Sequence, residues 1–180
     1  MKRTLHYKIL LLILVCLSFR INAATTLLSP TINNGGFESG NAGWTRDNAG
    51  GAAADKWFTG TATFFAGAKS AYISNDAGTT NAYTGATARV QHISRPITFP
   101  AGETSITLSF KWKTDGEGAF SDWDNLKVFV SSTTPTAGTE NAVADQVGDV
   151  WYNFEPTWQT ATITLPASLA GTTANLIFQW

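Results

Sequence analysis

The clearest alternation of apolar and polar side chains in this sequence lies between residues 105 and 113. Every even position from Ile106 to Trp112 carries a large apolar side chain, and every odd position carries a polar one. Because successive side chains of a β-strand point to opposite faces of its sheet, this period of two predicts a half-buried antiparallel strand. A pairing shifted by one residue would turn the apolar side chains toward water, so the pattern also specifies the register.

Other short segments, rich in β-branched and aromatic residues and bounded by turn residues, predict further strands. They cover residues 56–58, 61–65, 70–73, 88–94, 97–99, 125–131, 150–154, 158–165 and 174–180. Arg95 and Pro96 are expected to separate two of these strands, and residues 45–54 are expected to form a loop. Beyond the N-terminal apolar run no segment has a helical period, so we predict an all-β fold of two stacked antiparallel sheets, a β-sandwich.

The first 23 residues have the features of a secretory signal peptide. A basic start precedes an apolar run at residues 9–17, which is too short to span a bilayer, and Ala23 and Ala24 provide small residues after it. We predict a signal-peptide helix, cleavage after Ala23 or Ala24, and secretion to the extracellular space or the cell surface. A lipoprotein signal at Cys16, the only cysteine, is the competing interpretation, but Val15 stands where such a signal requires a small residue.

Cleavage would remove four basic residues and no acidic residue, so the formal net charge would change from −1 to −5. A mildly acidic chain without a basic cluster is not expected to bind nucleic acid. The mature chain has no second long apolar run, so we expect no membrane span after cleavage. Abundant Thr, Gly, Ala, Asn and Ser, with little Glu and Lys, is typical of strands and turns.

Residues 24–32 are expected to form a lead-in or linker, and residues 33–180 a single domain. Its last predicted strand ends with Leu176, Phe178 and Trp180 at alternate positions, without a turn or a polar tail after them. Because an open apolar edge strand favours aggregation, we expect at least one missing C-terminal strand and further domains of the same polypeptide after Trp180.

Residues 33–44 place a large apolar residue and a carboxylate between two turns rich in Gly and Asn. Phe37 and Trp44 are expected to be buried anchors. Glu38 follows Phe37 directly, where loop carbonyls could join its carboxylate in holding a hard cation such as calcium. The alternative is that Glu38 only accepts hydrogen bonds from loop N–H groups.

Several motifs occur in an order that is similar to one known family. They are Asn34-Gly35-Gly36-Phe37-Glu38-Ser39-Gly40 followed by Gly43-Trp44, Ser70-Ala71-Tyr72-Ile73-Ser74-Asn75-Asp76, residues 106–112, Asp124-Asn125-Leu126-Lys127-Val128-Phe129-Val130, and Trp158-Gln159-Thr160. Over residues 33–180 the set resembles the cleaved-adhesin or choice-of-anchor J modules, which are related to MAM domains and to galactose-binding-like carbohydrate-binding modules.

This resemblance implies a jelly-roll β-sandwich in a secreted or surface protein of Bacteroidetes-type bacteria. It also implies a structural calcium ion (Ca2+) with Glu38 among its ligands. The closing strand of the family usually carries acidic residues that share this ion, and this sequence lacks that segment. Asp122 and Asp124 are therefore the local candidates for further metal ligands.

Asp122 and Asp124 are also candidates for the pair of catalytic carboxylates of a glycoside hydrolase. Carboxylates at positions i and i+2 of a strand lie roughly 6 to 7 Å apart, within the range of the paired carboxylates of glycoside hydrolases. The next positions on the face of Asp122 and Asp124 hold Leu126 and Val128 rather than another acid. His92, the single histidine after the cleavage site, has no partner for a zinc site or a catalytic triad and is expected to be a hydrogen-bonded strand residue. We therefore expect no enzymatic activity.

Aromatic residues are the other candidates for a binding site. Trp112, Trp158 and Trp180 are expected in the core, and Trp44 and Trp57 under the loops. Four aromatic residues in or beside predicted loops could stack on a sugar ring or anchor a protein partner: Trp123, Trp151, Tyr83 and Tyr152. The alternative for each is packing within its loop.

These features predict a non-catalytic recognition or adhesion module that binds a glycan or a surface protein and is stabilised by calcium. A structural spacer in a multidomain secreted protein is one alternative, and a fragment of a glycoside hydrolase is another. A glycan site needs aromatic platforms flanked by polar groups in a concave surface, whereas protein adhesion uses a flatter apolar patch with a polar rim. The sequence leaves this choice open.

Overall fold

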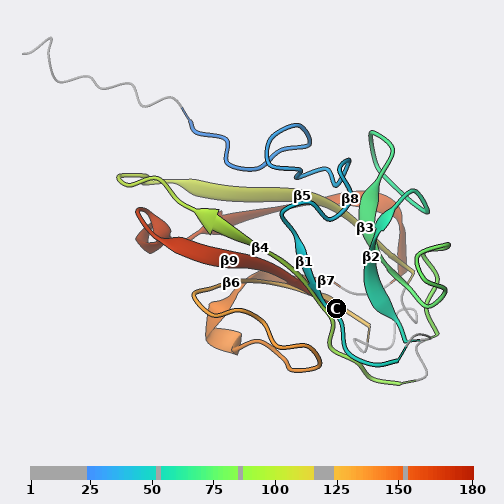
Figure 1. Ribbon diagram of the computed structural model, residues 1–180. Coiled ribbons are helices and arrows are strands. Elements are labelled where there is room, and N and C mark those ends of the chain that lie inside the picture. Colours follow the sequence, from blue (N-terminus) through green and yellow to red (C-terminus); the bar gives the residue numbers. More distant parts are fainter. Residues whose placement is uncertain (1–23, 52–53, 85–86, 116–123, 152–153) are drawn as a thin grey trace, which may run out of the picture.

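The computed structural model describes residues 24–51, 54–84, 87–115, 124–151 and 154–180, and within them the chain is all-β (Figure 1). Its strands are β1 (Thr45–Asp47), β2 (Lys56–Gly60), β3 (Ser70–Ser74), β4 (His92–Thr98), β5 (Ile106–Asp115), β6 (Leu126–Ser131), β7 (Gln146–Trp151), β8 (Phe154–Leu165) and β9 (Thr173–Gln179). Two single 3-10 turns, η1 (Val143–Asp145) and η2 (Ala167–Leu169), precede β7 and β9. The prediction of an all-β fold is confirmed, and the expected signal-peptide helix lies outside the described residues.

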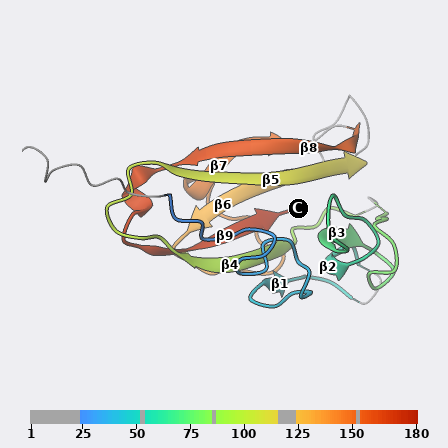
Figure 2. The ribbon, with the colours of Figure 1, turned by 90° about the horizontal axis from the view of Figure 1, so that it is seen from above.

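Every strand pair among the described residues is antiparallel. One sheet has five strands in the order β1-β4-β9-β6-β7, and β2-β3 and β5-β8 form two separate pairs. Figure 1 and Figure 2 show β5 and β8 on one side of the five-stranded sheet, and the β2–β3 hairpin toward the C-terminal end of β5. One hydrophobic core joins all three groups, with Leu176 from the large sheet, Ile163 from β8 and Trp57 from β2. The arrangement is therefore sandwich-like.

The pairing of β5 with β8 follows from their alternating patterns. Ile106 lies opposite Leu165, and two further pairs of core-facing residues follow along the ladder, Leu108 with Ile163 and Phe110 with Ala161. The intervening residues of β8, such as Thr162, are exposed. A shift by one residue would bury these threonines and expose the apolar side chains, so the observed register is the one that the pattern requires.

Strand β4 differs from the prediction, because it runs without interruption through Arg95 and Pro96. Proline lacks the N–H group that a central strand uses and is tolerated where one side of a strand is free. Here β1 pairs only with residues 92–94, while β9 pairs along the whole of β4. Pro96 therefore lies beyond the end of β1, where the missing N–H costs no ladder hydrogen bond on that side.

Two other local predictions were wrong. Residues 61–65 form bends and irregular structure rather than a strand, and Phe64 and Phe65 are 43% and 54% exposed. Their β-branched and aromatic composition suits a strand, but no neighbouring strand pairs with them within the described residues. Residues 45–47, expected in a loop, form β1 because β4 offers a free edge there.

The tryptophans follow the prediction only in part. Trp44, expected to be a buried anchor, is buried in the core, and Trp57, expected under the loops, also belongs to the buried core. Trp112 and Trp158, expected in the core, are only half-buried and line a groove that is described next. Trp180 is also half-buried and packs against the core. Alternation along a strand identifies which face a residue occupies, but it does not show how completely another element covers that face.

Candidate functional site

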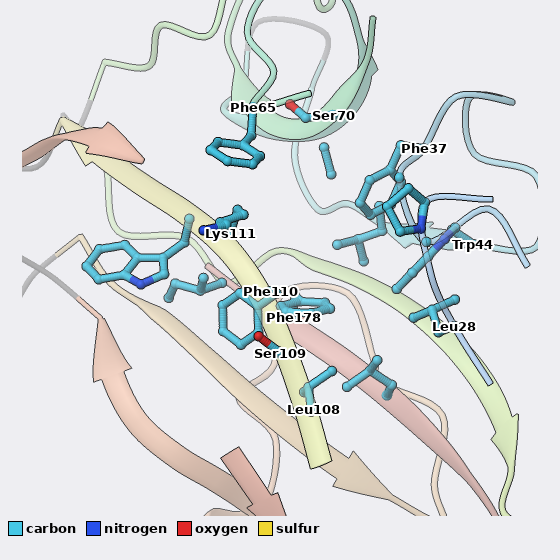
Figure 3. Close-up of a pocket in the computed structure, with 18 of the residues that line it drawn as sticks. Leu28, Phe37, Trp44, Phe65, Ser70, Leu108, Ser109, Phe110, Lys111 and Phe178 are labelled. Atoms are coloured by element: carbon cyan, nitrogen blue, oxygen red, sulfur yellow. The ribbon is translucent and has the colours of Figure 1, made fainter. Parts of the chain in front are cut away.

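A groove of about 1300 Å³ opens between β3 and β5 (Figure 3). Its floor is the inner face of the five-stranded sheet, including Ile93, Leu176 and Phe178. One wall is β5, and the other is built by β3 and the preceding residues 65–67. Leu27 and Leu28 of the N-terminal segment also line the groove and pack against the core.

The β5 wall is covered less completely than its partner strand. Ala161, Ile163 and Leu165 of β8 are each 6% exposed, as expected for core residues. Their partners in register on β5, Ile106, Leu108 and Phe110, are only half-buried. The groove is the reason, because these side chains lie along its wall. Apolar side chains left partly open in a concave surface are a common feature of binding sites.

A series of aromatic contacts stabilises the floor of the groove. The ring centroids of Phe37 and Trp44 lie 4.9 Å apart, and those of Trp44 and Phe178 lie 6.1 Å apart. Phe110 then meets Phe178 and Trp151 edge to face, each at 5.2 Å. Figure 3 shows Phe37 beside Trp44 and Phe110 beside Phe178. Edge-to-face pairs of this kind hold the rings in fixed orientations.

On the open side of the groove, Phe65 reaches across to the β5–β8 pair. The rings of Phe65 and Trp158 meet edge to face with centroids 6.1 Å apart. The Lys111 Nζ lies 4.6 Å from the Phe65 centroid, and Figure 3 shows the two side chains near each other. Lys113 places its Nζ 5.5 Å from the centroid of Trp158. These ring and cation contacts connect the turn at residues 61–69 with β5 and narrow the groove at this point.

Phe37 and Glu38 are positioned by a loop that Asn34 holds together. The Asn34 side-chain amide donates to the carbonyl oxygens of Gly40 and Ala42 at 3.0 Å, and its Oδ1 accepts from the N–H of Ser39 at 2.9 Å. Asn34 itself has a φ of 54°, a conformation that asparagine tolerates better than most residues because its side chain bonds locally. The turn chemistry read from the sequence therefore places Phe37 in the groove.

Glu38 is bound to the turn that precedes β3. Its Oε1 accepts hydrogen bonds from the N–H groups of Ala68 at 3.0 Å and Lys69 at 3.2 Å. The Lys69 Nζ donates to the backbone carbonyl of Glu38 at 3.0 Å. Gly67 adjoins this site, and a Cβ at that position would lie 2.1 Å from the Glu38 Oε1. The described contacts of Glu38 are thus hydrogen bonds from loop N–H groups, which was the alternative to calcium ligation.

The second candidate ligand, Asp124, also lines the groove, just before β6. Its Oδ2 is buried and has no hydrogen-bond partner among the described residues. Asp122 lies outside the described residues. Within the part of the chain that the structure describes, no group of three His, Cys, Asp or Glu side chains could hold a metal ion. Calcium at Glu38, Asp122 and Asp124 stays a prediction.

Two of the four candidate aromatic ligands can be placed. Trp151 ends β7 and packs against Phe110 and, with centroids 6.5 Å apart, against Trp112. Tyr83 meets the edge of Trp180 at 5.2 Å. Both residues line the groove, so their rings are part of its lining rather than separate platforms. Trp123 and Tyr152 lie outside the described residues.

His92 is a fully buried strand residue, as expected, and it does not line the groove. Its Nε2 lies 3.3 Å from the Oε1 of Gln179 on β9. Asp47 lies opposite His92 on β1, yet the His92 Nδ1 and the Asp47 Oδ2 are both buried without a hydrogen-bond partner among the described residues. Burial lowers the pKa of His92 below its ordinary value of 6.5, although the Gln179 hydrogen bond and the Asp47 charge act in the opposite direction.

The loop after β3 contains a second perturbed group. Asp76 accepts hydrogen bonds from the Ser74 hydroxyl at 2.7 Å and from the Thr80 N–H and hydroxyl. These bonds, chiefly the one from Ser74, lower the pKa of Asp76 to about 2. The residues form a closed turn that holds its own shape, so their role is structural.

Sequence reasoning did not identify the groove itself or its lining residues Phe65 and Lys111. Alternation marked the apolar face of β5, but it gave no sign that this face would remain partly open. Comparison with family models, with curated proteins and with solved structures found no match to the chain. No helix in the described residues is long and apolar enough to cross a membrane.

Proposed function

We propose that the chain is a non-catalytic recognition module of a secreted or cell-surface protein, and that its ligand, a glycan or a surface protein, binds in the groove between β3 and β5. A jelly-roll arrangement of the cleaved-adhesin or choice-of-anchor J type is part of this proposal. The observation that carries it is the groove, whose apolar β5 wall is left half-covered beside a fixed aromatic floor. Concave apolar sites with a few polar groups at their margins are typical of ligand binding.

The side chains of the groove support binding better than catalysis. Among the described residues that line it there is no histidine and no cysteine. The Glu38 carboxylate accepts hydrogen bonds from two backbone N–H groups, and these bonds hold the turn before β3. A catalytic carboxylate needs a second titratable group at a suitable distance and a pKa matched to its task. Glu103, Asp115 and Asp124 also line the groove, but the floor and the inward face of its β5 wall are apolar, which suits binding.

The calcium part of the proposal rests on Glu38, Asp122 and Asp124. A calcium ion takes six to eight oxygen ligands, and the described residues alone do not provide such a set. The buried Oδ2 of Asp124 is an oxygen that such an ion would satisfy.

An array experiment tests the proposed function. The secreted chain is applied to a glycan microarray and to an array of bacterial and host surface proteins, beside a Leu108→Lys variant and a Thr164→Lys control. Leu108 lies in the groove wall, whereas Thr164 is exposed on the outer face of the same strand pair. We expect binding that Leu108→Lys reduces about tenfold or more and Thr164→Lys leaves unchanged.

Binding that both variants retain would place the ligand site elsewhere on the molecule. No binding on either array would favour a spacer role.

A further inference from the structure

Along residues 106–113, the groove side of strand β5 has no strand partner among the described residues. Consecutive residues from 105 to 115 line the groove, while β8 contributes only Pro156, Trp158 and Leu165. A strand shows alternate residues on each face, so consecutive residues meet a cavity only along an edge. In the described residues β5 pairs with β8 and with no other strand. Its second edge therefore faces the groove.

The opposite wall has the same property. Residues 69–73, which include most of β3, line the groove in succession, whereas β2 contributes only Trp57. Strand β3 pairs with β2 alone among the described strands. The groove is thus bordered by two strand edges, and each edge carries backbone N–H and C=O groups in a regular row.

Both the backbone edges and the apolar lining favour an extended polypeptide as the occupant. Regular rows of donors and acceptors are matched by another strand, as in recognition by strand addition. Alternate side chains of such a strand would turn toward Leu108 and Phe110, which are half-buried in the groove wall. A glycan has no comparable row of N–H and C=O groups.

The charged side chains that line the groove indicate which charges the bound strand should carry. The groove is lined by three lysines: Lys69, Lys111 and Lys113. Among the described residues, none of these lysines forms an ion pair with a carboxylate. The ion pair observed there joins Lys127 and Glu140, outside the groove. Four acidic residues also line the groove. Glu38 accepts hydrogen bonds from the N–H groups of Ala68 and Lys69. The other three are Glu103 and Asp115, which lie near the two ends of β5, and Asp124, which lies just before β6.

The middle of the β5 edge is therefore basic. Cross-strand pairs of opposite charge stabilise a sheet, so carboxylates are favoured at the solvent-facing positions opposite Lys111 and Lys113.

We propose that the groove binds an extended strand of a partner polypeptide that pairs with the groove-facing edge of β5 along residues 106–113. Its side chains are apolar at every second position, facing the floor, and include Asp or Glu at the positions between. The inference rests on the proposed function and narrows it, since it assigns a polypeptide as the ligand class.

The first test is selection of a displayed library of random linear peptides on the secreted chain. We expect enriched peptides in which apolar residues alternate with polar residues that include Asp or Glu. The enriched peptides are then synthesised and titrated against the protein. Leu108→Lys and Lys111→Glu should each weaken binding about tenfold or more, and Thr164→Lys should not.

The second test addresses the backbone and does not depend on any protein variant. Each peptide is made in two versions that carry N-methyl groups on complementary sets of alternate residues. Pairing with β5 requires that at least one version loses binding by about tenfold or more, because methylation removes the N–H donors on one edge. Amide hydrogen exchange of β5 should slow in the peptide complex, since its edge groups become paired.

Three results would overturn the inference. One is enrichment of no peptide, or of peptides without alternation. Another is full binding by both methylated versions. The third is occupation of the edge by this polypeptide itself. This would appear as a dimer that Leu108→Lys abolishes, or as loss of peptide binding in a longer protein that contains the strand expected after Trp180. If the first result comes together with groove-dependent binding of a glycan on the array, the recognition function remains in place and only this inference fails.

Discussion

His92 and Asp47 form a buried, incompletely satisfied pair between β1 and β4. Both residues carry a polar atom without a hydrogen-bond partner in the described residues, and His92 has no exposed surface. Burial lowers the pKa of His92, so the neutral imidazole is the form that the folded state accommodates. A group with this behaviour makes stability depend on pH.

We expect the protein to lose stability as the pH falls below about 6.5, because the unfolded chain then binds a proton on His92 more readily than the folded chain. The stability that neutral His92 contributes is fully present above the pKa of His92 in the unfolded chain. It is lost as the pH falls toward the lower pKa of His92 in the folded protein. The groups that face His92 are Asp47 on β1 and Gln179 on β9, and Asp47 opposes the effect. Melting curves at about pH 7.5 and pH 5 should differ less for His92→Gln than for the wild type. An equal difference in both proteins would refute this assignment.

Gly67 is the second residue where the structure makes a sharp prediction. It has a φ of 75°, and a Cβ there would collide with the Glu38 carboxylate. Gly67→Ala should therefore strain the backbone and displace Glu38 from the N–H groups of Ala68 and Lys69, which costs about 1–3 kcal/mol of unfolding free energy. Urea unfolding measures this cost.

A matched control is Gly102→Ala, because Gly102 has a φ of 82° and nothing lies within 4 Å of a Cβ there. Gly67→Ala should be the more costly change. In a Glu38→Ala background the two substitutions should become similar in cost. If they already match in the wild-type background, the Glu38 contact contributes nothing measurable.

At the scale of elements, β5 and β8 pair over most of their length, yet their core-facing side chains are covered unequally. Ile163 of β8 is buried, whereas its partner Leu108 on β5 borders the groove. The stability of the two strands should therefore respond differently to truncation of their side chains.

We expect Ile163→Ala to lower the free energy of unfolding by about 2–5 kcal/mol, since it leaves a cavity in a closed part of the core. Leu108→Ala should cost about half as much, because part of that side chain is already exposed. Guanidinium unfolding of both variants gives the comparison. A larger cost for Leu108→Ala would show that the groove wall is closed in solution.

The elements that the sequence predicted well are those with a strong local pattern. The alternation at residues 105–113 and 158–165 predicted β5 and β8 and the faces that their apolar side chains occupy, while the structure shows that the two strands pair with each other. The failures at Pro96 and at residues 61–65 have one cause, because both depend on which strand lies alongside. A proline is harmless where β1 has ended, and a β-prone segment without a partner does not become a strand.

At the scale of the whole molecule, the calcium hypothesis can be tested without knowing the ligand. If Glu38, Asp122 and Asp124 hold calcium, the protein should melt at a higher temperature with calcium than with EDTA. A ligand that binds only the folded state adds about 2.7 kcal/mol at a hundredfold excess over its Kd. Asp124→Asn should reduce this difference, and differential scanning calorimetry measures both effects. An identical melting temperature with and without the chelator would rule the ion out.

The sequence could suggest the ingredients of the candidate site but not its location. Glu38 and Asp124 both line the groove, and so do Trp151 and Tyr83, although they come from distant parts of the chain. Phe65 escaped notice because its segment was expected to be a strand. Its importance comes from contacts with Trp158 and Lys111, nearly a hundred residues and about forty-five residues away in the chain.

The sequence by itself determined the all-β class, the faces of β5 and β8, and the turns that hold Phe37 and Glu38. These features depend on side-chain period and backbone preference, which are local properties of the chain. Only the tertiary structure decided that β3 and β5 leave their edges toward a common groove and that His92 meets Asp47. Those features depend on which strands become neighbours, and strand pairing joins residues far apart in the chain through backbone groups that every sequence shares.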